Sequence, residues 1–276
     1  VAASDINQTR HLMKVSDYLT YIAEAVLEYV LQMAWKTLTD KYGVPAKEDG
    51  APCDPSFVIV GYGKMGGIEL GYGSDLDLVF LHDAASQGVT DGDSKGKKSI
   101  DNGVFFTRLG QRIIHILNTL TPSGQLYEVD MRLRPSGNSG LLVSSVKAFR
   151  DYQQKEAWTW EKQALVRARV VAGSPEVADK FAEVRAEILT EERDLNQLKE
   201  DVVSMRIKMR DNLGSKPDAT GTHTSFHLKQ DAGGMVDIEF IAQYCVLRFS
   251  SEHPELLQWT DNMRILETVE QVGLLT

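Results

Sequence analysis

The chain has 276 residues, of which 42% are hydrophobic and 25% charged, and a formal net charge of −9. This length and composition are typical of a soluble globular protein that can bury one large or two modest cores. Proteins that bind nucleic acid usually carry an excess of basic residues, whereas this chain is acidic, so we expect no nucleic acid partner. Cys53 and Cys245 form no C-x-x-C pair, which predicts neither a zinc site nor a disulfide and fits a reducing compartment.

The first part of the chain is predicted to be helical. Apolar residues recur at helical spacing from residue 6 to about residue 42, which predicts one long or two shorter amphipathic helices. Gly and Pro punctuation over 45–55 indicates a linker. A strand is expected over 57–60, and it leads into a glycine-rich turn.

The turn reads Gly61-Tyr62-Gly63-Lys64-Met65-Gly66-Gly67, which contains the G-x-G-x-x-G pattern of dinucleotide-binding folds. A second glycine-rich break at 71–73 leaves no room for the long helix that such a fold needs, and no G-K-[ST] completes a P-loop. We interpret the segment as a backbone cradle for a triphosphate, since consecutive N–H groups can face an anion. The nucleotide-binding candidates here are Gly61, Gly63, Lys64, Gly66, Gly73 and Ser74. Alternatively, the glycines serve only a tight turn that needs positive φ.

Two carboxylates, Asp75 and Asp77, stand at the start of an apolar run that is predicted to be a buried strand over 75–82. Side chains alternate along a strand, so both carboxylates point the same way. Adjacent like charges beside a core are costly unless a cation or a proton neutralises them, and oxygen ligands suit Mg²⁺. The pair predicts half of a metal site, although an isolated Asp-x-Asp also occurs in surface turns.

A third carboxylate is expected to complete this site. After a polar loop over 84–102 and a helix over 105–117, the segment 126–134 alternates between apolar and charged residues and predicts a strand. If the two strands are neighbours, Asp130 joins the aspartate pair. Three carboxylates around two Mg²⁺ ions roughly 4 Å apart form the usual apparatus for in-line displacement at phosphorus.

The candidate catalytic and metal-binding residues are therefore Asp75, Asp77 and Asp130, with Asp130 as the bridging ligand or the general base. Arg132 and Arg134 share the charged face of the second strand and are candidates for neutralising phosphate charge. The alternative is that this charged face is simply solvated.

Further along, a strand is predicted near 141–143 and a helix over 145–160, whose Trp158 and Trp160 either stack on a base or belong to a core. If 166–171 is a strand, Arg167 and Arg169 share a face and either bind phosphate or pair with the acidic cluster. Helices are expected over 176–189 and 195–213 and from Met235 to Leu247, with a loop over 215–225. Asp237 and Glu239 lie two apart on the last helix, so no paired site follows.

Four blocks of the sequence, over 60–70, 74–77, 127–137 and 158–169, match one known family in the same order. A match of all four blocks is much more specific than a match of any single block. Together they resemble the glutamine synthetase adenylyltransferase family, most strongly from residue 55 to residue 175. That family belongs to the polymerase-β-like nucleotidyltransferase superfamily and carries two such domains in one long chain. Since this chain starts with Val and not Met, we expect it to be a fragment.

The resemblance implies an α+β fold, a mixed sheet with helices, flanked by helical segments on both sides. The expected domains are a helical segment and linker over 1–54, a nucleotidyltransferase domain over 55–173 and a truncated helical domain over 174–276. The implied reaction moves AMP from ATP·Mg²⁺ to a tyrosine hydroxyl of glutamine synthetase and releases pyrophosphate, which inactivates the synthetase in nitrogen regulation. A PII-type signalling protein and glutamine are the implied regulators. No run approaches the roughly twenty apolar residues of a membrane span, and the first residues lack the cationic and apolar blocks of a signal peptide, so we expect a cytoplasmic protein without a membrane partner.

Motif details favour the adenylylating domain of the two. They are Tyr62, the sequence Gly-Tyr-Gly-Ser over 71–74, Leu-His-Asp over 81–83 and the segment 156–160. Two alternatives stay open. The sister domain would use the same three aspartates to remove AMP by phosphorolysis, forming ADP, and a non-catalytic module would only bind nucleotide or glutamine. The complete aspartate set disfavours the second alternative, because a module that only binds needs no three clustered carboxylates.

Overall fold

The computed structural model describes residues 1–216 and 225–274. The chain divides into two compact units, each considered by itself below: Val1–Glu156 with Arg167–Arg185, and Ala157–Val166 with Ala186–Thr276. The predicted domain boundaries at 54/55 and 173/174 stay a prediction. Most of the predicted loop over 215–225 lies outside the described residues.

The first unit starts with a short helix, α1 (Ala2–Ile6), and a long one, α2 (Leu12–Tyr42), as the helical spacing predicts. Helix α2 ends at Gly43, whose φ of 80° suits a residue without a Cβ atom. Small and branched apolar residues along one side of α2 are buried: Val15, Ala23, Leu27, Val30, Leu31, Ala34 and Leu38.

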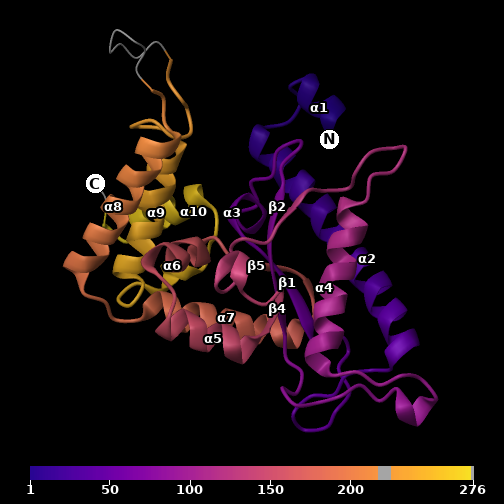
Figure 1. Cartoon of the computed structure of the whole chain (residues 1–276). Helices are drawn as coiled ribbons and strands as arrows, with labels where there is room; N and C mark the ends of the chain where they lie inside the picture. The colour runs from indigo at the N-terminus through magenta and orange to yellow at the C-terminus, as the bar shows by residue number, and fades with distance from the viewer. Residues whose placement is uncertain (217–224, 275–276) are drawn as a thin grey trace. The chain divides into compact units, whose positions relative to one another are not determined.

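Five strands form one mixed sheet in this unit (Figure 1): β1 (Phe57–Gly61), β2 (Leu76–His82), β3 (Val129–Asp130), β4 (Val143–Ser145) and β5 (Arg169–Gly173). Strand β1 is central and antiparallel to both β2 and β5. Strands β3 and β4 both pair in parallel with β2, the former where β2 begins and the latter where it ends. A mixed sheet with helices confirms the predicted α+β class.

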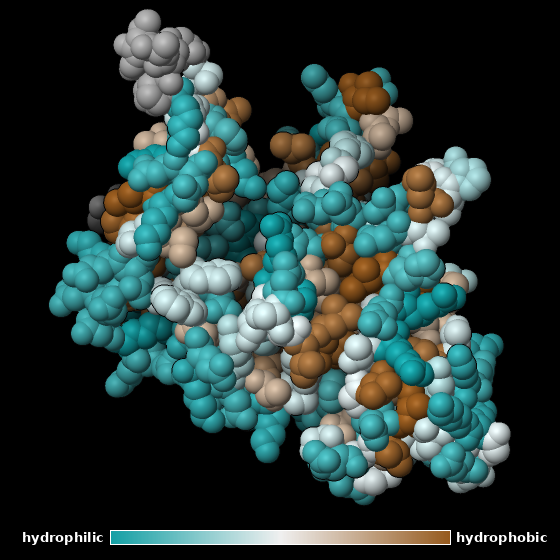
Figure 2. Space-filling view, in the orientation of Figure 1, coloured by the Kyte–Doolittle hydropathy of each residue, from teal (hydrophilic) through white to brown (hydrophobic). Residues whose placement is uncertain are grey.

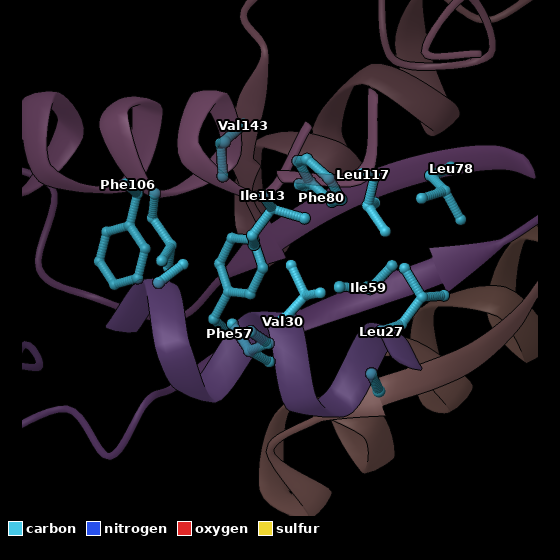
Figure 3. Packing of buried hydrophobic residues seen from close by; sticks show 14 of the residues in the cluster. Leu27, Val30, Phe57, Ile59, Leu78, Phe80, Phe106, Ile113, Leu117 and Val143 are labelled. Carbon is cyan, nitrogen blue, oxygen red and sulfur yellow. The ribbon is translucent and has the colours of Figure 1, made fainter. Parts of the chain in front are cut away.

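One face of this sheet is covered by α2 and by α4 (Asn102–Asn118), which lie side by side. Because Ile59 pairs with Phe80 in the β1/β2 register, alternate residues of both strands point to these helices. The aromatic rings of Phe106 and His82 stack with centroids 4.4 Å apart. Figure 3 shows how the two helices and three strands contribute to this core: Leu27, Val30, Phe57, Ile59, Leu78, Phe80, Phe106, Ile113, Leu117 and Val143.

The remaining helices of the first unit are α3 (Gly63–Gly66), α5 (Val146–Lys155) and the first part of α7 (Pro175–Thr190). Helix α5 contacts β2 and β4, and its Phe149 lies 5.9 Å from Phe181 of α7, centroid to centroid. The predicted loop over 84–102 contains a 3₁₀ turn, η1 (Asp93–Lys95), and an isolated bridge between Val89 and Asp101 before α4 begins. Asn102 donates to the carbonyls of residues 46 and 85, both at 3.0 Å, so the end of this loop is anchored.

Two sequence predictions of element length are wrong. The strand expected over 126–134 is reduced to two residues, because the chain turns where Arg134 N–H donates to the Met131 carbonyl at 3.3 Å and Pro135 offers no N–H. A short 3₁₀ turn, η2 (Gly137–Ser139), continues the bend. The helix expected over 145–160 stops at Lys155.

A new helix, α6 (Thr159–Val166), begins in the second unit. The Glu161 carboxylate reaches back and accepts a hydrogen bond from the Trp158 backbone N–H at 2.9 Å, as in one half of a capping box. Strand β5 then starts at Arg169 and not at residue 166, so Arg167 precedes it.

The rest of the second unit holds the end of α7, then α8 (Leu195–Leu213), α9 (Met235–Phe249), the 3₁₀ turn η3 (Pro254–Leu257) and α10 (Asn262–Gln271). Helices α6, α8 and α9 pack against one another, and α10 packs against α9. Asp194 caps α8 by accepting from the N–H groups of residues 196 and 197. The helices predicted over 195–213 and from Met235 to Leu247 are confirmed.

Among the described residues, no helix is both long enough and apolar enough to cross a membrane. Figure 2 shows one face of the molecule, on which hydrophobic residues form separate patches among hydrophilic ones. Such a mixture is ordinary for a protein surface.

Candidate active site

Three carboxylates meet where β2 begins. The parallel register places Asp77 directly opposite Asp130, and Asp75 lies just before β2. One oxygen atom from each of the three side chains lies within 4.8 Å of the other two. Asp75 is exposed, and the other two are half-buried. The structure therefore brings together the three residues that the sequence predicts, as an oxygen-only set that suits Mg²⁺.

The glycine-rich turn after β1 lies against this cluster. The Tyr62 backbone N–H donates to the Asp77 carbonyl at 2.9 Å, which fixes the start of the turn on β2. Gly63 has a φ of +52°, and a Cβ atom there would stand 2.8 Å from Asp77 Oδ2. Helix α3, which follows, has only four residues. The turn therefore does not open the long helix of a dinucleotide-binding fold, as the sequence predicts. Lys64 is exposed on α3.

The other predicted glycines have structural reasons of their own, either close packing or backbone conformation. A Cβ atom at Gly66 would stand 1.9 Å from the Arg167 carbonyl oxygen, and one at Gly61 would stand 2.6 Å from Met65 Cγ. Gly73 is exposed with a φ of +68° and has open space around it, so its conformation alone requires glycine. Ser74 Oγ accepts a hydrogen bond from the Gly71 N–H at 3.1 Å.

Arg132 binds the third carboxylate. Its backbone N–H donates to Asp130 Oδ1 at 2.8 Å and its Nε to Oδ2 at 2.7 Å, and Nη2 adds an ion pair. The Arg132 guanidinium holds the pKa of Asp130 below its usual range, against the opposing effect of partial burial. Asp130 in turn raises the pKa of Arg132, with smaller contributions from Asp77 and Asp75. Arg132 is 74% exposed, so it lies beside the cluster and faces solvent.

Arg134 has a different place from the one that a continuous strand would give it. Its guanidinium donates to the Met131 carbonyl at 2.7 Å and to the Asn138 carbonyl at 3.3 Å, so it braces the turn that follows β3. Its positive charge still contributes to lowering the pKa of Asp130. The roles predicted for Arg132 and Arg134 toward phosphate stay predictions.

The sequence left two functions open for Arg167 and Arg169, and the structure gives both an ion-pair partner. Arg167 is buried and pairs with Glu69, whereas Arg169 pairs with Glu24 of α2. Neither of these partners belongs to the aspartate cluster. No short-range pattern could have identified Glu24, because it precedes Arg169 by 145 residues.

The tryptophans and the later acidic pair belong to the second unit. Trp158 is 73% exposed and Trp160 39% exposed, so neither ring is a core residue there. Asp237 forms an ion pair with Arg206 and accepts from the Gly233 N–H at 2.6 Å. Glu239 lies one turn before Gln243, whose side chain donates to it at 3.2 Å. The expectation that the two acids form no paired site agrees with these separate partners.

Comparison with known families identifies the chain. The family model described as glutamate-ammonia ligase adenylyltransferase matches residues 1–184. The chain belongs to this family. The match includes all three clustered aspartates and the glycine-rich turn.

Curated relatives within the adenylyltransferase family are similar over the whole chain. Proteins of Pseudomonas aeruginosa and Pseudomonas putida are 61% and 59% identical over 100% of this chain, and one of Hahella chejuensis is 58% identical over 99%. Each is named bifunctional glutamine synthetase adenylyltransferase/adenylyl-removing enzyme. The chain spans 28% of the length of these relatives.

Proposed function

We propose that this chain transfers AMP from ATP to a tyrosine hydroxyl of glutamine synthetase, with Mg²⁺ as cofactor and pyrophosphate as product. The observation that carries the proposal is the cluster of Asp75, Asp77 and Asp130, whose oxygen atoms lie within 4.8 Å of one another. The family membership and the names of the curated relatives support the choice of substrate.

The cluster fits Mg²⁺. All three donors are carboxylates, and the absence of a side chain at Gly63 leaves the space beside Asp77 Oδ2 open. Asp75, Asp77 and Asp130 would hold the metal, which we expect as two ions. Bound Mg²⁺ would lower the pKa of the attacking hydroxyl and neutralise charge on the phosphates.

In the proposed reaction the tyrosine hydroxyl gives up its proton to water, its oxygen forms a bond to the α-phosphorus, the bond from that phosphorus to the α,β-bridging oxygen breaks, and pyrophosphate leaves. The protein would mainly position the reactants and neutralise charge. Asp130 suits the role of metal ligand better than that of general base, because Arg132 lowers its pKa and a carboxylate with a low pKa takes up a proton poorly. Arg132, exposed beside the cluster, would meet the phosphates.

We propose that the two glycine-rich turns bind the nucleotide. Gly63 keeps the backbone after β1 close to Asp77, whereas Gly61 and Gly66 allow the turn to pack against Met65 and Arg167, and Lys64 is exposed on α3. Gly73 and Ser74 form the second turn, immediately before Asp75. Backbone N–H groups and the Lys64 ammonium would donate to the triphosphate. Arg134 would act at longer range, since its Nη1 and Nη2 donate to backbone carbonyls.

The alternative within the family is the reverse process, removal of AMP from adenylylated glutamine synthetase by orthophosphate to give ADP. The names of the curated relatives include both activities. The motif details around Tyr62 and over 71–74, 81–83 and 156–160 favour addition of AMP. As further parts of the proposal, a PII-type signalling protein and glutamine regulate the reaction, and the protein works in the cytoplasm without a nucleic acid partner.

The test uses the protein expressed from its complete reading frame. It is incubated with Mg²⁺, ATP labelled at the α-phosphorus and unmodified glutamine synthetase, and both the label on the synthetase and the released pyrophosphate are measured. Asp75→Asn and Asp130→Asn remove one charge each from the cluster. Asp151→Asn is the control, since Asp151 pairs with Lys155 on the exposed side of α5.

We expect label on glutamine synthetase with the wild type and with Asp151→Asn, and none with the two cluster variants. Equal labelling by all four proteins, with phosphate-dependent ADP formation from adenylylated synthetase lost only in the two cluster variants, would assign the adenylyl-removing reaction to this site. Equal labelling and equal ADP formation by all four proteins would refute a catalytic role for the carboxylates. Binding of ATP without either reaction would identify a regulatory module.

A further inference from the structure

We propose that Arg169 is a positioning residue which, held by Glu24, fixes the glycine-rich turn in the place where it meets the nucleotide. The inference rests on the proposed function, since it concerns the same site. It adds two residues, on α2 and β5, that do not touch the carboxylate cluster but determine where α3 lies relative to it.

The guanidinium of Arg169 connects three elements. Its Nη2 forms an ion pair with Glu24 Oε1 of α2. Its Nε donates to the Gly66 carbonyl at 3.3 Å, and Nη2 lies 3.5 Å from the Met65 carbonyl. Arg169 itself is the first residue of β5. One planar group therefore links α2 and β5 to the last turn of α3.

Helix α3 needs such a contact from outside. It has only four residues, and so short a helix has almost no stability of its own. The last carbonyls of a helix lack partners within it, and a positively charged donor at that end satisfies them and interacts favourably with the helix dipole. The rigid fork of an arginine can serve two acceptors and a carboxylate together, which the single ammonium of a lysine cannot do in the same geometry.

The position of α3 affects the active site because its first residue, Gly63, packs against Asp77. A Cβ atom at Gly63 would lie 2.8 Å from Asp77 Oδ2, so the backbone of the turn passes close to the carboxylate. If α3 moves, the backbone N–H groups proposed to bind phosphate move relative to the carboxylates. A misplacement of about 1 Å can reduce the rate of an enzyme by about 100-fold.

Helix α2 holds both ends of β5. Glu24 pairs with Arg169 at the start of this strand, and Glu28 Oε2, one turn further along α2, accepts from the Gly173 N–H at 3.0 Å at its end. The two glutamates therefore set the position of β5 relative to α2. Through Arg169 the same helix also sets the position of the glycine-rich turn.

The test compares Arg169→Gln, Arg169→Lys and Glu24→Gln with the wild type. Lys47→Gln is the matched control, because Lys47 forms an ion pair with Glu176 across distant parts of the same unit. Three quantities are measured on the protein from its complete reading frame: the affinity for α,β-methylene-ATP with Mg²⁺, the KM for ATP and the kcat of the transfer. This analogue cannot donate AMP, so its affinity reports binding alone.

We expect Arg169→Gln to weaken binding of the analogue and to raise the KM for ATP, each by roughly tenfold. Arg169→Lys should lie close to Arg169→Gln, because it keeps the charge but not the fork. Glu24→Gln should give a smaller change in the same direction, and Lys47→Gln none. A merely structural role would lower the melting temperature of Arg169→Gln and leave the KM of the folded fraction unchanged.

Hydrogen exchange without any nucleotide separates this inference from the proposed function. The amides of Gly66 and Gly67 donate to the carbonyls of Tyr62 and Gly63 within the turn. We expect both amides to exchange several-fold faster in Arg169→Gln than in Lys47→Gln. Unchanged exchange, or unchanged affinity for the analogue, would overturn the positioning role.

If the wild type binds no ATP analogue while the exchange rates still change, the proposed function fails and the role of Arg169 in fixing the turn stands. Should Arg169→Gln not fold, Arg169→Lys and Glu24→Gln decide the matter in the same way.

Discussion

The contact between Gly63 and Asp77 can be tested by one methyl group. In Gly63→Ala the new Cβ atom would stand 2.8 Å from Asp77 Oδ2. A carbon and an oxygen atom in ordinary contact lie about 3.4 Å apart, so the carboxylate or the turn must move by roughly half an ångström. Alanine would also have to adopt the φ of +52°, which costs about 1 kcal/mol relative to glycine.

These two effects act on different properties. The backbone strain lowers the free energy of unfolding, whereas displacement of the carboxylate lowers metal affinity, because Mg²⁺ demands nearly ideal octahedral geometry. Changes in the groups that orient a metal ligand typically reduce affinity by about 10–100-fold. Gly96→Ala is the matched control, since Gly96 has a φ of +67° and its Cβ atom would meet no other atom within 4 Å.

The assay uses Mn²⁺ as a paramagnetic substitute for Mg²⁺ and measures its binding by electron paramagnetic resonance, with urea unfolding in parallel. Both alanine variants should lose about 1 kcal/mol of stability. Only Gly63→Ala should bind Mn²⁺ at least about tenfold more weakly. If it binds Mn²⁺ as tightly as Gly96→Ala does, the reasoning about the turn and the carboxylate is wrong.

Three further predictions concern the fold. Gly66→Ala should destabilise the protein by more than about 2 kcal/mol in urea unfolding. Its Cβ atom would stand 1.9 Å from the backbone carbonyl oxygen of Arg167, and a backbone atom cannot move aside as a flexible side chain can. A urea midpoint equal to that of the wild type would contradict this. Phe106→Ala should cost about 3–5 kcal/mol because the ring is fully buried, whereas Val104→Ala, at a position 40% exposed on the same helix, should cost less than about 1 kcal/mol in the same titration. Burial lowers the pKa of His82 to about 4, so the unfolded chain takes up a proton from pH 6.5 downward while the folded protein does not. Stability should therefore fall by roughly 3 kcal/mol between pH 6.5 and pH 4, and in His82→Gln this part of the slope should disappear.

The sequence predicts best what depends on local patterns. Helix α2 follows from apolar residues at helical spacing, and β1 and β2 follow from short apolar runs bounded by glycine. The aspartate cluster could be predicted because alternation on a strand fixes the direction of Asp75 and Asp77, and a later acidic residue, Asp130, lies on a second alternating segment.

What the sequence does not predict depends on contacts between distant residues. Alternation over 126–134 predicts a long strand, but Asp130 and Arg132 bind each other and the chain turns before Pro135. The break before α6 did have a local signal, the glutamate three residues after Trp158. The ion pair between Glu24 and Arg169 had none, since an acidic residue on a long helix has many potential partners.

The three carboxylates are not held equally firmly. Asp77 belongs to β2, which is paired along both edges, whereas Asp130 ends a strand of two residues. Opening β3 disrupts two register pairs and the bond from the Leu76 N–H to the Glu128 carbonyl, so it requires less free energy than opening β2. Opening of β3 would separate Asp130 from the other two carboxylates in the metal-free protein. Substitutions that lengthen β3 would favour the complete ligand set and tighten cation binding without touching a ligand.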